Sequence, residues 1–93
     1  MEDLDYKVNY LFNVILEKID ILISWSKKDK RIKKELRDYH HYLIREADIL
    51  KIMWENGDAY NKIFVYNCLL KMLIDVNKVI DYFKRKYNLK INE

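Results

Sequence analysis

The side chains best suited to binding chemistry in this chain are cations at helical spacing. Between positions 27 and 45 they recur every three or four residues: Lys27, Lys30, Lys34, Arg37, His41 and Arg45. This spacing places them on one face of a helix, as a ridge about 27 Å long at 1.5 Å per residue. A row of cations this long can follow several phosphates, and phosphate contacts dominate nucleic-acid affinity. The pattern therefore predicts a candidate surface for DNA or RNA.

A solvated helix face is the competing interpretation of this charge run. Arg31 and Glu35 stand four residues apart, as do Lys34 and Asp38, and such pairs neutralise charge locally. Against this interpretation, seven of the eleven residues from 27 to 37 are basic. They would lie at the positive end of a helix dipole, where acidic residues are favoured. Both interpretations stay open, and the solvated face is the default.

The other reactive side chains form no catalytic or metal-binding pattern. His40 and His41 are adjacent, so on a helix they point about 100° apart and cannot readily share a metal ion. Cys68 is the only cysteine and stands in an apolar stretch, as a buried inert thiol would. Glu17 and Asp20 fit a solvated strip better than a catalytic pair. We therefore expect a protein that is not an enzyme and that uses no metal and no cofactor.

Length and composition favour one small helical domain, residues 1–93. The chain has one glycine and no proline, and 51% of its residues are apolar. So few turn residues argue against a many-stranded β fold. The formal net charge of +3 is modest. A single cysteine, an acidic start unlike a signal peptide, and charges within every apolar run predict a cytoplasmic protein without a membrane span.

Apolar periodicity predicts three long helices, over about residues 2–26, 29–56 and 58–88. Ser26 or Asp29 is the candidate N-cap of the second helix. Gly57 is expected to end that helix in the left-handed conformation, and Asp58 to cap the third helix. The residues after position 88 are expected to be frayed. In an alternative, one continuous helix runs through residues 24–29, which would force domain-swapped or coiled-coil packing.

Short turns between long helices favour an all-α antiparallel bundle. In this up-down-up order, the start of the second helix and the end of the third lie at the same end of the molecule. The cations of both segments should therefore gather there. The candidate residues for binding nucleic acid or another anion are Lys27, Lys30, Arg31, Lys34, Arg37, His41, Arg45, Lys84, Arg85 and Lys86.

The chain has more large apolar side chains than a three-helix core needs. A second apolar stripe on the first helix points roughly away from its main apolar face at 100° per residue. Large groups at such spacing are typical of obligate interfaces, so we expect a homodimer that completes the bundle. The candidate interface residues are Tyr10, Val14, Ile21, Trp25, Ile52 and Phe64.

Two functional hypotheses follow from these patterns. In the first, the chain is a small non-enzymatic interaction protein that self-associates and acts through contacts with a protein partner, as an adaptor, inhibitor or assembly subunit. In the second, it binds DNA or RNA through the basic ridge on the second helix and the basic end of the third. The sequence identifies neither the protein partner nor the pathway.

Overall fold

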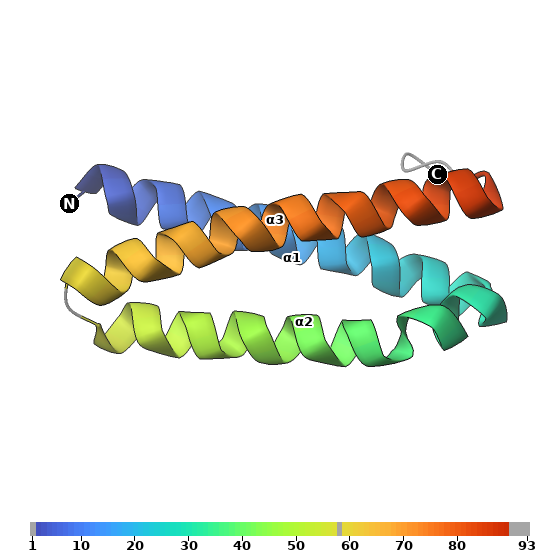
Figure 1. Ribbon diagram of the computed structural model, residues 1–93, viewed down its shortest axis with the longest axis horizontal. Coiled ribbons are helices and arrows are strands. Elements are labelled where there is room, and N and C mark those ends of the chain that lie inside the picture. Colours follow the sequence, from blue (N-terminus) through green and yellow to red (C-terminus); the bar gives the residue numbers. More distant parts are fainter. Residues whose placement is uncertain (1, 58, 90–93) are drawn as a thin grey trace.

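The protein is a bundle of three long helices. The computed structural model describes residues 2–57 and 59–89, but not the side chains of residues 2, 59 and 60. The helices are α1 (Glu2–Lys28), α2 (Lys30–Asn56) and α3 (Ala59–Tyr87), and the described residues contain no strand (Figure 1). The predicted all-α class and the three helices are confirmed, and each observed boundary lies within two residues of the predicted one.

The helices run up, down and up, and each packs against the other two (Figure 1). The backbone measures 42 × 23 × 16 Å, with a radius of gyration of 14.5 Å. A compact domain of this length would have a radius of gyration of about 12 Å. The molecule is therefore a short rod, with a large share of its surface along the helix sides.

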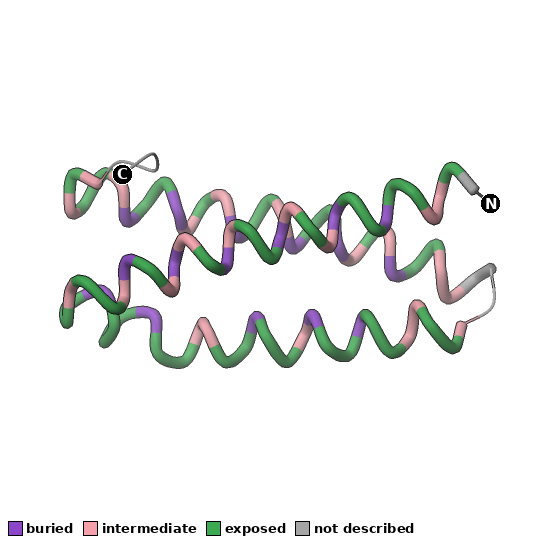
Figure 2. The backbone as a smooth tube through the Cα atoms, turned by 180° about the vertical axis from the view of Figure 1, so that it is seen from behind, coloured by how far each residue is buried: buried purple, intermediate pink, exposed green. Residues whose placement is uncertain are grey.

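The core is a single apolar strip between the helices, as Figure 2 shows in purple. Each helix contributes residues spaced three or four apart, because that spacing keeps side chains on one face. The apolar face of α2 is buried at Ile32, Leu36, Leu43, Ala47 and Leu50. The buried residues of α1 and α3 are Val8, Leu11, Ile15, Ile19, Leu22, Trp25, Val65, Leu69, Met72, Val76, Ile80 and Phe83.

One non-helical residue, Asp29, separates α1 from α2. Its backbone is extended, with φ −138° and ψ 117°, so the continuous helix considered for residues 24–29 does not form. Its N–H donates to the carbonyl of Trp25 and its carbonyl accepts from the N–H of Lys33, both at 3.0 Å. Its carboxylate accepts from the N–H of Arg31 at 2.9 Å, which is N-cap geometry. Asp29, one of the two predicted caps, therefore both ends α1 and starts α2.

Gly57 ends α2 for a different reason from the one predicted. Its φ is −90° and its ψ is 157°, so the left-handed conformation is not used. A Cβ atom at this position would lie 2.5 Å from the carbonyl oxygen of Met53 and 2.7 Å from the Cβ of Asn61. The glycine is needed for space. The predicted capping residue of α3, Asp58, lies outside the described residues.

The left-handed conformation occurs instead at the end of α3. Asn88 has φ 52°, and the N–H of Leu89 donates to the carbonyl of Lys84 at 3.0 Å. This bond, reaching back five residues across a left-handed residue, is the Schellman arrangement that closes helices. Leu89 also packs against the core, so the chain is ordered one residue beyond the predicted start of the frayed tail. Residues 90–93 lie outside the described part of the chain.

Among the described residues, no helix has a stretch that is both long and apolar enough to cross a bilayer.

Candidate functional site

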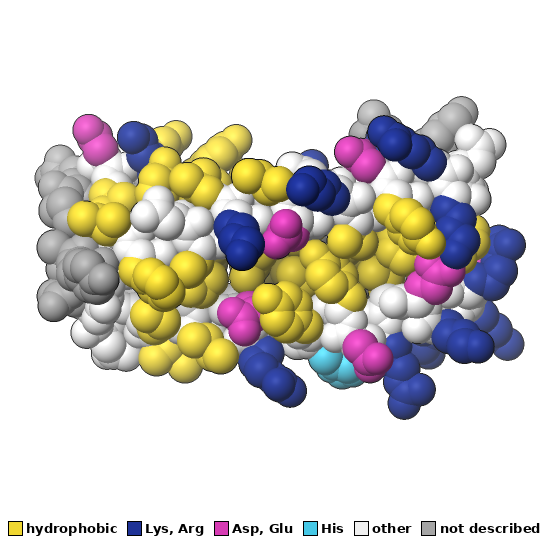
Figure 3. All heavy atoms as spheres, viewed as in Figure 1, with side chains coloured by type: hydrophobic (Ala, Val, Ile, Leu, Met, Phe, Trp, Pro, Cys, Tyr) yellow, Lys and Arg dark blue, Asp and Glu magenta, His cyan; other side chains and the backbone are white. Residues whose placement is uncertain are grey.

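The start of α2 and the end of α3 meet at one end of the rod, as the helix order predicts. The ammonium of Lys86 contacts the carboxylate of Glu35, and the hydroxyl of Tyr87 donates to the same carboxylate at 3.0 Å. The guanidinium of Arg31 lies 4.8 Å from the centre of the Tyr87 ring. Figure 3 shows lysine and arginine side chains crowded around this end.

Two of the cations predicted to bind a ligand form ion pairs within the protein. Arg31 holds the carboxylate of Asp29 through Nη2 at 2.8 Å and Nε at 3.2 Å. Lys86 holds Glu35 and also lies 3.1 Å from the hydroxyl of Tyr82. Arg31 lowers the pKa of Asp29 to about 2, and Lys86 lowers the pKa of Glu35. In return, Asp29 raises the pKa of Arg31 and Glu35 raises that of Lys86. These cations are paired within the protein and are therefore less free to bind a ligand.

The local ion pairs expected along α2 are not the ones that form. Arg31 pairs with Asp29 instead of Glu35, and Glu35 pairs with Lys86 across the bundle. Within the described residues, Lys34 and Asp38 form no ion pair. The acidic residues near the start of α2 therefore leave most of its lysines uncompensated.

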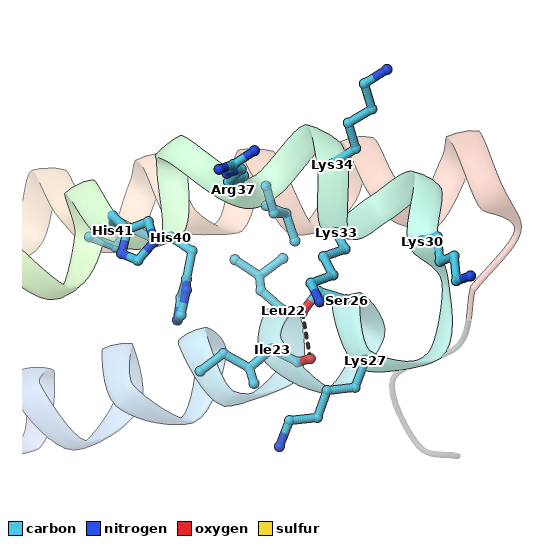
Figure 4. Close-up of a pocket in the computed structure, with 12 residues that line it drawn as sticks. Leu22, Ile23, Ser26, Lys27, Lys30, Lys33, Lys34, Arg37, His40 and His41 are labelled. Carbon is cyan, nitrogen blue, oxygen red and sulfur yellow. Dashed lines mark hydrogen bonds between the residues drawn. The ribbon is translucent and has the colours of Figure 1, made fainter.

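Five other lysine and arginine residues border a groove between the end of α1 and the first half of α2 (Figure 4). We call this feature the α1–α2 groove, and its volume is about 790 Å³. Its floor is apolar, and no aspartate or glutamate of the described residues lines it. The lining residues are Leu22, Ile23, Ser26, Lys27, Lys30, Lys33, Lys34, Leu36, Arg37, His40, His41 and Leu43.

The cations of the groove are electrostatically unsatisfied. Lys30, Lys33, Lys34 and Arg37 are all exposed, and none forms an ion pair within the described chain. Each of them stands three or four residues from two of the others, so like charges are neighbours on the helix surface. The first of them also lies at the positive end of the α2 dipole. Repulsion among these cations destabilises α2. An anion bound in the groove would reduce that repulsion.

His40 adds an unsatisfied polar atom to the same groove. Its Nε2 is buried and has no hydrogen-bond partner among the described residues. In Figure 4 its side chain extends from α2 toward α1, whereas His41 lies beside it on α2. The described residues contain no group of three side chains that could hold a metal ion. Cys68, expected to be fully buried, is half-buried on α3, away from the groove lining.

Apart from Arg31, which pairs with Asp29, the predicted cationic residues fall into three groups. Lys27, Lys30, Lys34, Arg37 and His41 line the α1–α2 groove. Arg45 is exposed farther along α2, and Lys84 is half-buried on α3. Arg85 and Lys86 border a separate shallow hollow of about 510 Å³, which also includes Asp81.

Sequence reasoning missed part of the groove. Lys33 stands three residues after Lys30 and four before Arg37, so its spacing carried the signal. The apolar floor carried no comparable signal, because Leu22, Leu36 and Leu43 have ordinary core spacing. Only the separation of α1 and α2 shows that this part of the core borders an opening.

Trp25 was predicted to lie at an interface between two copies of the chain, but it is buried within one copy. Its side chain is only 6% exposed and belongs to the core. It follows Leu22 by three residues, which is core spacing, and the reversal at Asp29 brings α2 back alongside the last turn of α1. Val14 and Ile21 are half-buried, and Ile21 packs against the core. Tyr10, Ile52 and Phe64 are exposed, so three of the six predicted interface residues stand free on the surface.

A clearer apolar surface lies along the outer side of α3. Ile63, Leu70 and Ile74 are 51%, 37% and 56% exposed. They are spaced seven and four residues apart, on the side of α3 opposite its buried residues. We call these three residues the outer stripe of α3. Figure 3 shows apolar side chains spread over α3 and over the neighbouring end of α2.

Comparison with known proteins adds no relative to this description. No protein-family model, curated protein or solved structure matches the chain.

Proposed function

We propose that the protein is a small interaction protein that works through protein–protein contacts and self-associates as a homodimer. The observation that supports this proposal is the outer stripe of α3, whose three residues Ile63, Leu70 and Ile74 are exposed to between 37% and 56%. A solvated helix face normally carries polar residues there. Burying this stripe against a second copy would remove apolar area from water, at roughly 25 cal/mol per Å².

The shape of the molecule supports the same proposal. The three-helix rod has one apolar strip inside and a second apolar surface outside, over α3 and the adjoining end of α2 (Figure 3). Two copies related by a twofold axis would present the same surface to each other, which is the commonest arrangement in homo-oligomers. Ile52 on α2 and Phe64 on α3, both exposed, would extend the contact beyond the stripe.

Sedimentation velocity over a range of concentrations tests the proposal. The wild-type chain should sediment as a dimer at micromolar concentrations. The double variant Leu70→Glu/Ile74→Glu should sediment as a monomer with unchanged helical circular dichroism, because it puts charge into the apolar contact. Lys71→Glu is the matched control, since Lys71 is exposed on α3 between the two substituted residues. A wild-type chain that is monomeric at every accessible concentration would exclude self-association.

Nucleic-acid binding is the second candidate function. It is supported by the exposed cations that begin with Lys27 and end with Arg37, and by Arg85 at the same end of the rod. Fluorescence anisotropy with labelled duplex DNA and labelled RNA over a salt series tests it. Binding should weaken steeply as salt rises, because each neutralised phosphate releases counterions. Unchanged affinity after reversing Lys30, Lys34 and Arg37 together would reject this function.

A further inference from the structure

We propose that the α1–α2 groove binds an acidic amphipathic helix of a partner protein. This inference rests on the proposed function in one respect: it takes the chain to act through protein contacts. It uses a different surface from the outer stripe of α3 and names the chemistry of the partner. An apolar floor bordered by cations requires a ligand with an apolar side and negative charges beside it.

The length of the groove suits a helix. On α2 its lining extends from Lys30 to Leu43, which is about 20 Å at 1.5 Å per residue. A helix of three to four turns has the same length. The groove lies between two antiparallel helices that are joined by one residue, so a third helix laid along them would meet both. An amphipathic helix in an apolar groove is a recurring mode of peptide recognition, and here it would add a fourth helix to the bundle.

The positive charge of the groove indicates that the polar residues of the partner helix are acidic. Lys27 borders the groove from α1, and Lys30, Lys33, Lys34 and Arg37 border it from α2. Within residues 2–57 and 59–89, no acidic side chain lines it. Aspartates and glutamates on both sides of an apolar stripe would therefore face cations across the groove. The acids would also add negative charge at the positive end of the α2 dipole, where Asp29 is the N-cap but the first turn holds no acidic residue.

Two other anionic ligands fit the lining less well. Nucleic acid would use the cations but would leave the apolar floor without a partner. Single-stranded DNA or RNA could stack its bases on aromatic rings, but the described part of the chain places no tyrosine, phenylalanine or tryptophan in the groove lining. A fatty acid would fill the floor but would bring one carboxylate to five cations. A helix supplies several carboxylates and an apolar stripe together.

Three synthetic peptides test the assignment against the full-length chain by fluorescence anisotropy. The probe is a labelled helix of about 18 residues, or five turns, made of leucine, alanine and glutamate with leucines at i, i+4, i+7 and i+11. One control has the same composition in scrambled order, so it keeps the charge and loses the stripe. The other has lysine in place of glutamate. We expect binding of the acidic amphipathic peptide alone.

Matched variants locate the binding. The pair Lys33→Glu/Arg37→Glu should weaken binding at least about tenfold, because it replaces two cations of the groove with acids. The pair Arg45→Glu/Lys51→Glu makes the same change in net charge on exposed residues of α2 outside the groove lining. It should change affinity by no more than about twofold. Circular dichroism of each variant verifies that the helices remain formed.

Each contrary outcome overturns the assignment in a distinct way. Equal affinity for the ordered and scrambled peptides would mean that charge alone is recognised. Equal loss in both variant pairs would mean that binding is not located in the groove. Stoichiometric binding of oleate or of duplex DNA, with no binding of the acidic peptide, would assign the groove to that ligand instead.

The result can be separated from the fate of the proposed dimer. If the chain sediments as a monomer and binds the acidic peptide in the groove, the groove proposal is supported and the dimer proposal is rejected. If the chain is a dimer and binds none of the peptides, the dimer proposal is supported and the groove proposal is rejected.

Discussion

Asp29 is the residue that allows α1 and α2 to form a hairpin without a loop. Its backbone takes part in the last hydrogen bond of α1 and the first of α2, and its side chain caps α2 and pairs with Arg31. Ser26, the other candidate cap, donates its hydroxyl to the carbonyl of Ile23 within α1. The cap could be anticipated from residue type, but the choice between two candidates depended on where α1 ends.

Replacing Asp29 with alanine should lower the melting temperature by about 5 °C, because an N-cap and its hydrogen bond are lost. Asp29→Ser should keep most of the stability, because serine also caps helices. Thermal unfolding followed by circular dichroism measures both. Equal stability of the alanine and serine variants would show that capping by this side chain has no net effect.

The carboxylates of Asp29 and Glu35 should make the stability of the protein sensitive to acid. The folded pKa of Asp29, about 2, lies below the ordinary value of 3.8, and that of Glu35 is also lowered. A depressed folded pKa stabilises the fold above the unfolded pKa and ceases to do so as pH falls through the folded value. The melting temperature should therefore fall between about pH 5 and pH 2. The double variant Asp29→Asn/Glu35→Gln should show a smaller fall over that range, and an identical fall would remove these two residues as its cause.

At the scale of the element, the apolar face of α2 favours the helix, whereas the distribution of its charges disfavours it. Its buried residues follow helical spacing throughout. Its first turn holds no acidic residue, although acids are favoured at that end of a helix. Selection for stability alone would not produce this arrangement, and a stability loss at a binding site is a familiar compromise.

Acidic substitutions at the start of α2 should therefore stabilise the protein. Lys30→Glu combined with Lys33→Glu should raise the melting temperature by about 5 °C at low salt, because both charges then match the dipole. Arg45→Glu, in the middle of the helix, should change it less. Melting curves at low and high salt test this, since screening should reduce the gain. A fall in melting temperature would show that these lysines stabilise the fold.

Helix positions could be predicted from the sequence because they depend on local periodicity and capping. The closing arrangement at Asn88 and the need for space at Gly57 could not, because both depend on atoms of neighbouring turns. Trp25 was misplaced because its angle on an isolated helix says little about how far the returning α2 covers it. The groove and the Glu35–Lys86 pair depend on the distance between helices, and that pair is separated by 51 residues.

At the scale of the whole molecule, the two ends of the rod differ in the side chains that they expose. Lysine and arginine side chains crowd the end where α1 turns into α2, and apolar side chains cover much of α3 and the other end of α2 (Figure 3). The helix order alone led to the expectation that the cations of α2 and α3 lie at the same end of the molecule. The two proposed contacts therefore use separate parts of the surface, so a partner helix and a second copy could be bound together.

Self-association should make the melting temperature depend on concentration, because only the folded chain dimerises. Raising the protein concentration a hundredfold should raise the melting temperature by several degrees for wild type. The Leu70→Glu/Ile74→Glu variant should show little such dependence. Superimposable wild-type melting curves across that range would argue against a folded dimer.

The single-residue link at Asp29 has a consequence for proteolysis. Lys27, Lys28, Lys30 and Arg31 offer trypsin four adjacent cleavage sites on exposed residues, which in a loop would be cut at once. Here all four belong to helices, and one extended residue gives a protease no stretch of chain to bind. Cutting requires the hairpin to unwind, so the rate of tryptic cleavage between Lys27 and Arg31 reports how often α1 and α2 separate.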